Sequence, residues 1–406
     1  MADHVLNTQE LDNRPCTGVM SPVRAWIAVT VLAAAVFAVT ATEMLPIGVL
    51  TSISDDLRVS VGTAGLSVTL YGIVAGLFAP LMTRWTRGVD RRTVVLVIIT
   101  VFILGNGATA LVTTNAQFLA VRFVVGIAHG LMWSIVAAVA VRLVSPPQRV
   151  RATAVTFSGI SLALVFGVPA GTWLGEWVGW RGAFAALAGL TAVTAFAVIA
   201  AMPAMPALRL TGSRSLRAVL RHSGIKRILL VTGAVVIGNY AAYTYIAPYL
   251  FDSVGASSYL VGVCLLVYGV AGVLGNAMVG VVPIRSRVML LSGAGIVAVT
   301  LLILTAPVGK YGVIVLVGVW GLSYSALPVL LQTSVFDAAP YLREAATSLY
   351  VLVFNVSIAG GALVGALGVD QLGPLAPMAF GAAFCALGVA ASVGIRGGVA
   401  VEGNPR

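Results

Sequence analysis

Long apolar stretches without charge alternate with short polar segments along the whole chain. A helix of about 20 apolar residues crosses a bilayer, and each stretch approaches or exceeds that length. Their length and lack of alternation exclude the strands of a membrane β-barrel, which are about 10 residues long. The predicted spans are residues 25–50, 59–83, 93–121, 123–141, 152–175, 182–208, 228–251, 253–284, 288–309, 311–336, 345–369 and 371–395.

This pattern predicts an all-α membrane protein of twelve transmembrane helices in two six-helix halves, residues 25–202 and 228–396. A basic linker, residues 203–227, joins the halves, and residues 1–24 and 397–406 are polar tails. The chain is 59% hydrophobic and only 9% charged, which is more apolar surface than a soluble domain can bury. The first span is too long for a signal-peptide core, so we expect it to stay in the mature protein.

Basic residues gather in alternate loops. If the N-terminus is cytoplasmic, all 24 Lys and Arg residues except Arg58, Arg122, Arg181 and Lys310 fall on the cytoplasmic side. The positive-inside rule therefore predicts that both tails and the linker are cytoplasmic. The acid-free linker can bind anionic lipid, or it can serve only as a solvated topology anchor. This distribution accounts for the net charge of +11 without a nucleic-acid partner.

One acid interrupts the first apolar run, in the segment TATEMLP of residues 40–46. A charged side chain at this depth costs roughly 2.5–3.5 kcal/mol, which makes Glu43 a candidate functional residue. Pro46 has no N–H to donate to the carbonyl of Thr42, so the helix should bend or loosen beside the acid. The alternative is a protonated Glu43 that only hydrogen-bonds a neighbouring helix. No other acid in the sequence lies at such depth, which favours a functional role.

The fourth span carries a polar stripe. At 100° per residue, His129 and Trp133 each fall within about 20° of Arg122 on the helix surface. An arginine keeps its charge, so this stripe must face a cavity or a carboxylate. His129 is then either a titratable group in the cavity or a structural side chain with satisfied hydrogen bonds.

The two halves share a motif at the same relative position. The segment PPQRVRAT (146–153) leads into the fifth span, and PYLREAAT (340–347) leads into the eleventh. These matches predict a duplicated six-helix unit, the plan of many secondary transporters. At the same spacing, two pairs of glycines correspond: Gly167 with Gly361, and Gly171 with Gly365.

Polar aromatic residues and amides collect in the seventh, tenth and eleventh spans. Aromatic rings with hydroxyl and amide partners suit a neutral polyhydroxy or heteroaromatic solute. Some of these side chains can instead be interfacial anchors, notably Tyr249 near a span end. The predicted solute-binding residues are Trp133, Asn239, Tyr243, Trp320, Tyr324 and Asn355.

A membrane-embedded enzyme and a channel are the rival classes. A protease would need a buried Ser–His pair or two aspartates, and a metalloenzyme would need an H-E-x-x-H motif. His4 and His222 lie in polar segments, and Glu43 has no second buried acid. The charge rings and filter repeats of channels are missing from the sequence, and the three cysteines are scattered. We therefore expect a transporter that uses no metal and no cofactor.

The loop GLFAPLMTRWTRGVDRR (76–92) resembles the cytoplasmic G-x-x-x-D-R-x-G-R-R motif of the major facilitator superfamily. Arg91 and Arg92 match its two final arginines, whereas Arg87 and Asp90 depart from it. In the fourth span, LAVRFVVG (119–126), which contains Arg122 and Gly126, is similar to the family's L-x-x-x-R-x-x-x-G pattern. The resemblance implies a gating role for Arg91 and Arg92.

The fifth span narrows the resemblance. Its sequence GVPAG, with Gly167, Pro169 and Gly171, resembles the Gly/Pro-rich fifth-helix motif of the drug:proton antiporters. Small residues four apart let helices approach closely, and Pro169 bends the span. Five more segments resemble one branch of this group, the bacterial sugar-efflux transporters with their chloramphenicol-resistance and purine-efflux relatives. They are residues 43–46, 129–134, 243–248, 354–355 and 359–365.

The resemblance implies that spans 1, 4, 7 and 10 line a central cavity. Glu43 is expected to carry a coupling proton that Arg122 tunes, with His129 the other titratable candidate at depth. The function predicted is proton antiport that exports a small neutral or amphiphilic solute, a sugar or an antibiotic, by alternating access. The alternative is proton-coupled import or export of another metabolite, such as a nucleobase or an amino-acid derivative. We expect a monomer in the lipid bilayer of the bacterial cytoplasmic membrane.

Overall fold

A computed structural model describes residues 21–206 apart from residue 87, and residues 223–281, 286–338 and 343–392. Every regular element in these ranges is a helix. Outside the described residues lie most of both predicted tails, most of the basic linker, Arg87, Cys16, His4 and His222.

The described residues contain nine continuous helical stretches that are long and apolar enough to cross a membrane. One of them, Pro146–Ala201, holds two spans, because the backbone turns at Gly179 with a φ of 76°. Glycine adopts this left-handed conformation without a Cβ clash. The shorter apolar helices Val288–Ile303 and Ala376–Ser392 supply two further spans. The chain is therefore a multi-pass, all-α membrane protein, and the predicted twelve transmembrane helices are confirmed.

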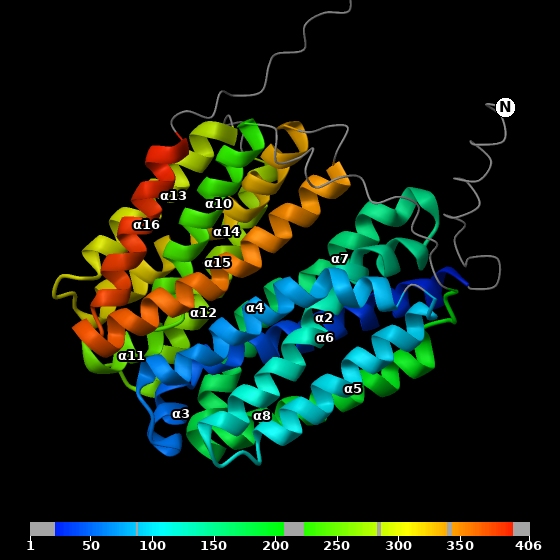
Figure 1. Ribbon diagram of the computed structural model, residues 1–406, viewed down its shortest axis with the longest axis horizontal. Helices are drawn as coiled ribbons and strands as arrows, with labels where there is room; N and C mark the ends of the chain where they lie inside the picture. Colours follow the sequence, from blue (N-terminus) through cyan, green and yellow to red (C-terminus); the bar gives the residue numbers. More distant parts are fainter. Residues whose placement is uncertain (1–20, 87, 207–222, 282–285, 339–342, 393–406) are drawn as a thin grey trace, which may run out of the picture. The chain divides into compact units, whose positions relative to one another are not determined.

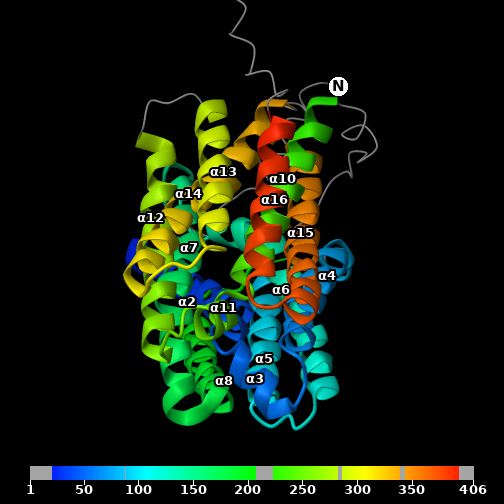
Figure 2. The same ribbon diagram turned by 90° about the vertical axis from the view of Figure 1, so that its left-hand side faces the viewer.

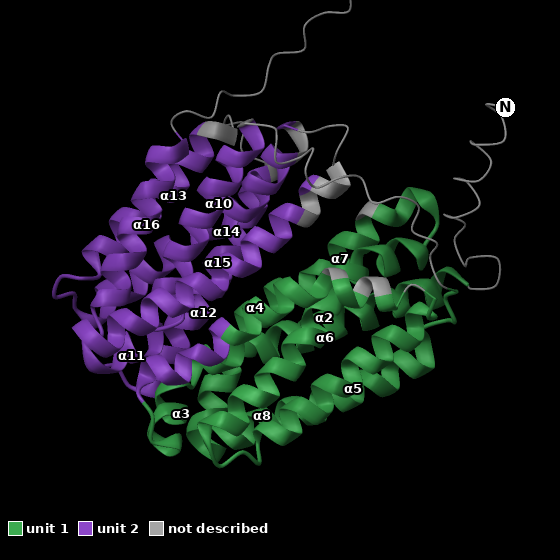
Figure 3. Cartoon of the chain, in the orientation of Figure 1, with its two compact units in different colours: residues 1–59, 70–211 green, residues 60–69, 212–406 purple. Residues whose placement is uncertain are grey.

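The chain packs as two compact units (Figure 3). Unit 1 comprises residues 1–59 and 70–211, and unit 2 comprises residues 60–69 and 212–406. The helix that contains residues 60–69 therefore begins in unit 2 and continues in unit 1.

Asp370 explains why the start of this helix packs with unit 2. One carboxylate oxygen of Asp370 accepts a hydrogen bond from the backbone N–H of Gly62 at 2.9 Å, and the other accepts from the hydroxyl of Ser60 at 2.6 Å. An acid at this position satisfies backbone N–H groups that a helix leaves free in its first turn.

The first helix, α2, is the packing centre of unit 1 (Figure 1). It packs along α7 and α8, and α5 packs against α6 and α8. The second half of α2 is buried on all sides, as its continuous apolar sequence requires. The elements are α2 (Pro22–Gly48), α3 (Leu50–Leu57), α4 (Val61–Trp85), α5 (Arg91–Thr109), α6 (Asn115–Arg142), a 3₁₀ turn (Pro146–Gln148), α7 (Arg149–Leu162), a π-helical turn (Ala163–Gly167) and α8 (Val168–Ala201).

In unit 2, α10 packs against α15 and α16, while α12 lies along α14 (Figure 2). Helix α13 contacts α14 and α16. The elements are α10 (Ser223–Tyr243), α11 (Ile246–Asp252), α12 (Ser258–Val281), α13 (Ser286–Ile303), α14 (Lys310–Ala338), α15 (Arg343–Leu372) and α16 (Ala376–Ser392).

Corresponding glycines make corresponding contacts in the two units. Gly171 of α8 packs on Leu45 of α2, so a side chain there would collide with the leucine. Gly365 of α15 packs in the same way on the backbone carbonyl of Ala241 of α10. In both units, a small residue of the fifth helix of the half lets it approach the first helix closely. Pro169, in the first turn of α8, follows the π-helical turn, which absorbs the local change in helical winding.

Helix α6 begins earlier in the chain than the pattern of apolar runs predicts. The apolar runs suggested a boundary near Arg122, but α5 ends at Thr109 and α6 begins at Asn115. Thr114 and Gln117 form a capping box in which each side chain accepts from the other residue's backbone N–H. This cap satisfies the free N–H groups of the first turn and fixes the helix start there. Arg122 consequently lies two turns inside α6.

Candidate functional site

Glu43 lies in the buried second half of α2, with only 7% of its surface exposed. Pro46, three residues later, lies inside the same helix, which ends at Gly48. Because Pro46 lacks an N–H, the carbonyl of Thr42 has lost its usual partner in the helical ladder. The acid and the freed carbonyl are therefore neighbours on one helix, as the sequence predicts.

Arg122 supplies the missing hydrogen bond. Its Nη1 donates to the carbonyl oxygen of Thr42 at 2.9 Å, and its Nη2 donates to that of Glu43 at 3.2 Å. The guanidinium thus binds the backbone of α2 next to the carboxylate. The arginine is 1% exposed. Charge-assisted bonds of this kind are about twice as strong as neutral ones. Arg122 accordingly repairs the weakened helix and places a fixed positive charge beside Glu43.

Tyr71 of α4 joins the same cluster, although the sequence analysis did not single it out. Its ring lies under the guanidinium of Arg122, whose Cζ is 4.2 Å from the ring centroid. Its hydroxyl is 2.9 Å from Nδ1 of His129. Gly126 lets the two helices approach, because a Cβ there would lie 3.0 Å from the carbonyl oxygen of Tyr71. The signal for Tyr71 that the sequence offered was a tyrosine inside an apolar run, together with a glycine in another span.

His129 connects the acid to an aromatic side chain. Its Nε2 is 3.6 Å from Oε2 of Glu43 and accepts a hydrogen bond from Nε1 of Trp133 at 2.6 Å. His129 is 1% exposed, whereas Trp133 is half-buried. The structure therefore brings all four stripe and acid residues, Glu43, Arg122, His129 and Trp133, into one network together with Tyr71.

Asn106 of α5 supports the acid-bearing segment from another side. Its Nδ2 donates to the hydroxyl of Thr42 at 2.9 Å, and that hydroxyl donates to the carbonyl of Ala38 at 2.8 Å. Asn106 is 1% exposed. The sequence analysis passed over this asparagine, although an amide inside an apolar span is costly unless it is hydrogen-bonded.

A second polar cluster lies in unit 2 and carries no charge. Oδ1 of Asn239 accepts hydrogen bonds from Nε1 of Trp320 at 2.9 Å and from the hydroxyl of Tyr268 at 3.2 Å. The ring of Tyr243 stacks on Tyr268 with centroids 4.5 Å apart, and Trp320 meets both rings edge-on. Three of the predicted solute-binding residues thus come together, and Tyr268 of α12 is an unpredicted fourth member.

The phenol groups of Tyr243 and Tyr324 in unit 2 are buried without a hydrogen-bond partner among the described residues. A buried hydroxyl left without a partner is costly, so both are available to a polar ligand.

Two further polar residues of unit 2 donate to backbone carbonyls. Nδ2 of Asn355 donates to the carbonyl of Val351 on its own helix at 2.9 Å. The hydroxyl of Tyr249 donates to the carbonyl of Leu304 at 2.9 Å, and its side chain is buried within unit 2. Tyr249 is therefore a packing residue of unit 2, and the alternative of an interfacial anchor is wrong for it.

Arg91 and Arg92 tie the start of α5 to unit 1. Nη1 of Arg91 donates to the carbonyl of Thr86 at 3.1 Å, and Nη2 of Arg92 donates to that of Ile199 at 2.5 Å. Asp90, which departs from the family motif, caps α5 by accepting from the backbone N–H groups of Arg92 and Thr93. These three residues thus fix the start of α5.

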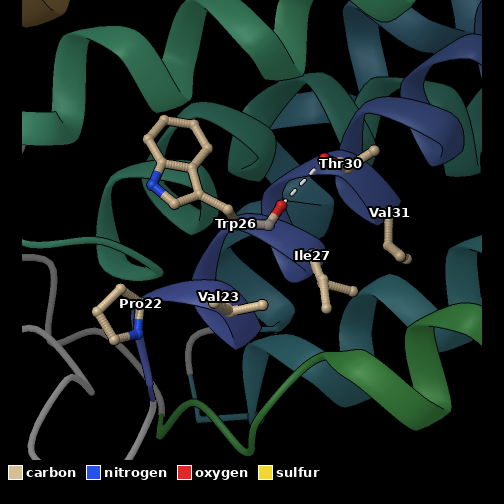
Figure 4. Close-up of a pocket in the computed structure, with 6 residues that line it drawn as sticks. All are labelled: Pro22, Val23, Trp26, Ile27, Thr30 and Val31. Atoms are coloured by element: carbon tan, nitrogen blue, oxygen red, sulfur yellow. Dashed lines mark hydrogen bonds between the residues drawn. The ribbon is translucent and has the colours of Figure 1, made fainter.

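A shallow groove lies beside the first turns of α2 (Figure 4). All its lining residues come from that one helix and none is titratable. Its single hydroxyl, that of Thr30, donates to the backbone carbonyl of Trp26 at 3.0 Å. The groove is therefore mainly apolar, in contrast to the two clusters. The lining residues are Pro22, Val23, Trp26, Ile27, Thr30 and Val31.

Comparison with known families decides the class of the protein. A family model described as Major Facilitator Superfamily matches residues 32–362. The chain belongs to the Major Facilitator Superfamily. The matched region includes the whole Glu43 cluster and most of the residues of unit 2, so both clusters lie within the family's fold.

Two solved structures share the fold at low sequence identity. One is a mutant of the nucleoside transporter NupG, with a TM-score of 0.71 and 15% identity over 91% of this chain and 98% of NupG. The other is a bacterial homologue of the human lysosomal transporter Spinster, inward-facing and unoccupied. Its TM-score is 0.64 at 16% identity, over 93% of this chain and 95% of that one. Membership of the superfamily indicates a transporter that acts on a small-molecule solute across a membrane.

Proposed function

We propose that the protein is a proton-coupled secondary transporter that exports a small neutral or amphiphilic solute by antiport with protons. The observation that carries the proposal is the buried Glu43 beside the Arg122-bridged break in α2, 3.6 Å from the imidazole of His129. A buried acid in a membrane span is a functional group by default, because its charge is costly there. Glu43 is the group that would take up and release the coupling proton.

The surroundings of Glu43 set two opposing influences on its charge. Arg122 is a permanent cation bound to the backbone of the same segment, and it favours the carboxylate. Burial among apolar side chains favours the neutral acid. Alternating access can change which influence dominates, because one state hydrates the acid and the other seals it. A proton is then loaded on one side of the membrane and released on the other.

The uncharged cluster in unit 2 supports a neutral solute. Stacked rings bind the faces of a sugar or an aromatic ring, and the free hydroxyls of Tyr243 and Tyr324 offer hydrogen bonds. Neither hydroxyl nor the Asn239 amide favours a multivalent cation, which needs carboxylates. A sugar or an amphiphilic antibiotic fits this chemistry, and both are proposed as export substrates.

A second candidate is a nucleobase or nucleoside. The stacked pair of Tyr243 and Tyr268 lies beside an amide, Asn239, and this combination suits a flat heteroaromatic ring with polar edges. The direction of transport and the solute distinguish this candidate from sugar or antibiotic efflux.

The proposed setting is the bacterial cytoplasmic membrane, with a monomer whose termini and linker of residues 203–227 face the cytoplasm. Arg91 and Arg92 are proposed as gating residues, and Gly167, Pro169 and Gly171 as the packing hinge of the fifth span. A single cysteine placed in the linker should react with a membrane-impermeant maleimide only after the cells are opened. Labelling of intact cells would contradict this topology.

The test uses purified protein in proteoliposomes with radiolabelled lactose, chloramphenicol and adenosine as probes. Glu43→Gln should abolish uphill transport driven by a pH gradient but keep solute counterflow, since counterflow needs no net proton movement. Glu176→Gln, at an exposed acid of α8, is the matched control and should transport normally. Uphill transport by Glu43→Gln would place the coupling site elsewhere.

A further inference from the structure

One nitrogen atom, Nε2 of His129, has two neighbours that compete for it. The indole N–H of Trp133 donates to it at 2.6 Å, and Oε2 of Glu43 is 3.6 Å away. An indole nitrogen is a donor only, so the lone pair of Nε2 is occupied and this nitrogen carries no proton. The neutral imidazole must then carry its proton on Nδ1.

Tyr71 holds the other end of the imidazole. Nδ1 of His129 is 2.9 Å from the hydroxyl oxygen of Tyr71, which accepts the Nδ1 proton in this tautomer. Two side chains, one on α4 and one on α6, therefore fix both the orientation and the tautomer of His129. Such an arrangement leaves Nε2 as the basic atom that faces the acid.

Glu43 cannot use this basic atom while Trp133 occupies it. A ring nitrogen of neutral imidazole accepts one in-plane hydrogen bond, and the carboxyl oxygen at 3.6 Å lies beyond hydrogen-bond distance. If the indole N–H moves away, a protonated Glu43 can donate to Nε2. The proton can then pass from Oε2 of Glu43 to Nε2 of His129, which leaves a carboxylate and an imidazolium whose Nδ1–H still donates to the hydroxyl oxygen of Tyr71.

Trp133 is the member of the network that a solute can reach. It is half-buried, while Glu43, Tyr71, Arg122 and His129 are all buried. Its ring lies against Phe157 of α7, with centroids 5.9 Å apart. A solute that accepts a hydrogen bond from the indole N–H would draw it off Nε2.

We propose that Trp133 is a hydrogen-bond gate between solute and proton: its indole N–H blocks the acceptor nitrogen of His129, and solute binding unblocks it. Trp133 and Tyr71 act on Glu43 through His129 and are positioning residues. This inference rests on the proposed function. It explains why solute and proton are coupled without direct contact between the solute and Glu43.

The charged groups around Glu43 and His129 determine whether His129 keeps the proton that it receives. Among the described residues, the titratable and charged groups that face Glu43 and His129 are Tyr71 of α4 and Arg122 of α6. Helices α5 and α7 contribute uncharged Asn106 and Phe157. An imidazolium next to the fixed cation of Arg122 is unfavourable. The proton received by His129 therefore leaves once the site opens to water.

The first experiment determines the tautomer. The chain has three histidines, so replacing His4 and His222 with glutamine leaves His129 as the only imidazole in ¹⁵N-histidine-labelled protein. Nitrogen chemical shifts, measured in nanodiscs without solute, distinguish the two neutral tautomers and the imidazolium. We expect a proton on Nδ1 and none on Nε2, which accepts the hydrogen bond from the Trp133 indole. A neutral imidazole with its proton on Nε2 would overturn the proposal.

The second experiment removes the gate. Trp133→Phe keeps an aromatic ring but loses the N–H, so Nε2 becomes free to accept from Glu43. We expect the Glu43–His129 pair to bind its proton at a pH about 0.5–1 unit higher, as followed by the ¹⁵N shifts and the infrared carboxyl band that Glu43→Gln removes. Trp177→Phe, at a tryptophan that is 80% exposed, should leave the midpoint unchanged. An unchanged midpoint in Trp133→Phe would refute the gate.

Tyr71→Phe provides an independent variant if Trp133→Phe does not yield folded protein. Loss of the hydroxyl removes the acceptor for the Nδ1 proton while Trp133 still donates to Nε2, so the Nδ1 tautomer should persist but the Nδ1 nitrogen shift should move to that of an N–H without a hydrogen bond. An unchanged Nδ1 shift would contradict the positioning role of Tyr71. Neither measurement needs a solute or a pH gradient, so failure of the gate and failure of proton-coupled transport are distinguishable.

Discussion

The two units build their polar clusters at equivalent places, but only unit 1 uses charge. The segment with Thr42, Glu43 and Pro46, inside α2 near its end, corresponds in sequence to Thr244, Tyr245 and Pro248 at the break between α10 and α11. Glu43 therefore has a tyrosine, Tyr245, as its counterpart. The phenol of Tyr245 donates to the carbonyl of Ala362 at 2.9 Å. In unit 2 a neutral hydrogen bond to the neighbouring helix stabilises the break.

The fourth helices of the two units show the same contrast. Gly126 of α6 packs on the backbone of Tyr71, and Gly321 of α14 packs on the backbone of Tyr268. With these glycines aligned, Val317 stands at the position of Arg122.

His129 also has a neutral counterpart. It lies three residues after Gly126, and the residue three after Gly321 is Tyr324. Glu43, Arg122 and His129 thus have uncharged counterparts at the aligned positions of unit 2. Under the proposed function, the proton-binding group lies in unit 1, and the neutral cluster of unit 2 provides stacked rings and free hydroxyls for the solute.

The largest expected effect comes from removing the cation of unit 1. Arg122→Ala leaves the carbonyl of Thr42 unpaired and Glu43 without its neighbouring charge, and loss of a buried charged partner costs about 3–5 kcal/mol. We expect a large fall in thermal stability in detergent and no uphill transport.

Arg122→Lys is the companion variant. An ammonium can reach one carbonyl but cannot form the two-nitrogen contact, so stability should recover in part and the pH optimum should move. The equivalent change in unit 2, Val317→Ala, should cost about 1 kcal/mol. Equal losses for Arg122→Ala and Val317→Ala would remove the distinction between the units.

A second prediction places an acid in the neutral unit. Tyr245→Glu recreates the charge of Glu43 at the equivalent break, but no arginine stands at the equivalent position. The buried acid should cost roughly 2.5–3.5 kcal/mol, lower the melting temperature, and add no second proton to the transport cycle. Stoichiometry from the reversal potential in proteoliposomes checks the last point. A doubled proton count would show that a carboxyl group alone is enough for coupling.

The smallest effects separate solute contacts from packing contacts within unit 2. Tyr243→Phe and Tyr324→Phe remove hydroxyls without a partner among the described residues, so stability should stay unchanged while counterflow affinity falls about fivefold to tenfold. Tyr249→Phe removes a hydroxyl bonded to the carbonyl of Leu304. It should cost about 1 kcal/mol of stability and leave affinity unchanged. The reverse pattern would assign the free hydroxyls to packing.

Much of this organisation could be predicted from the sequence because it depends on one helix at a time. The apolar runs fix the number of spans, since each must be long enough to cross a bilayer. Helical periodicity placed His129 and Trp133 on the same face as Arg122, and the proline rule identified the carbonyl of Thr42 as free. The roles assigned to these residues stay predictions, although the structure places them in one network.

The tertiary structure decided which helices meet and which atoms pair. Tyr71, Asn106 and Tyr268 each lie on a different helix from their partners, and only the rotation and crossing of those helices brings a phenol or an amide into hydrogen-bond range. The sequence also did not show that Arg122 binds backbone carbonyls while His129 lies nearest the carboxylate. Periodicity specifies the face of a helix, but the partner of that face is set by close packing at glycines such as Gly126, which depends on all neighbouring helices together.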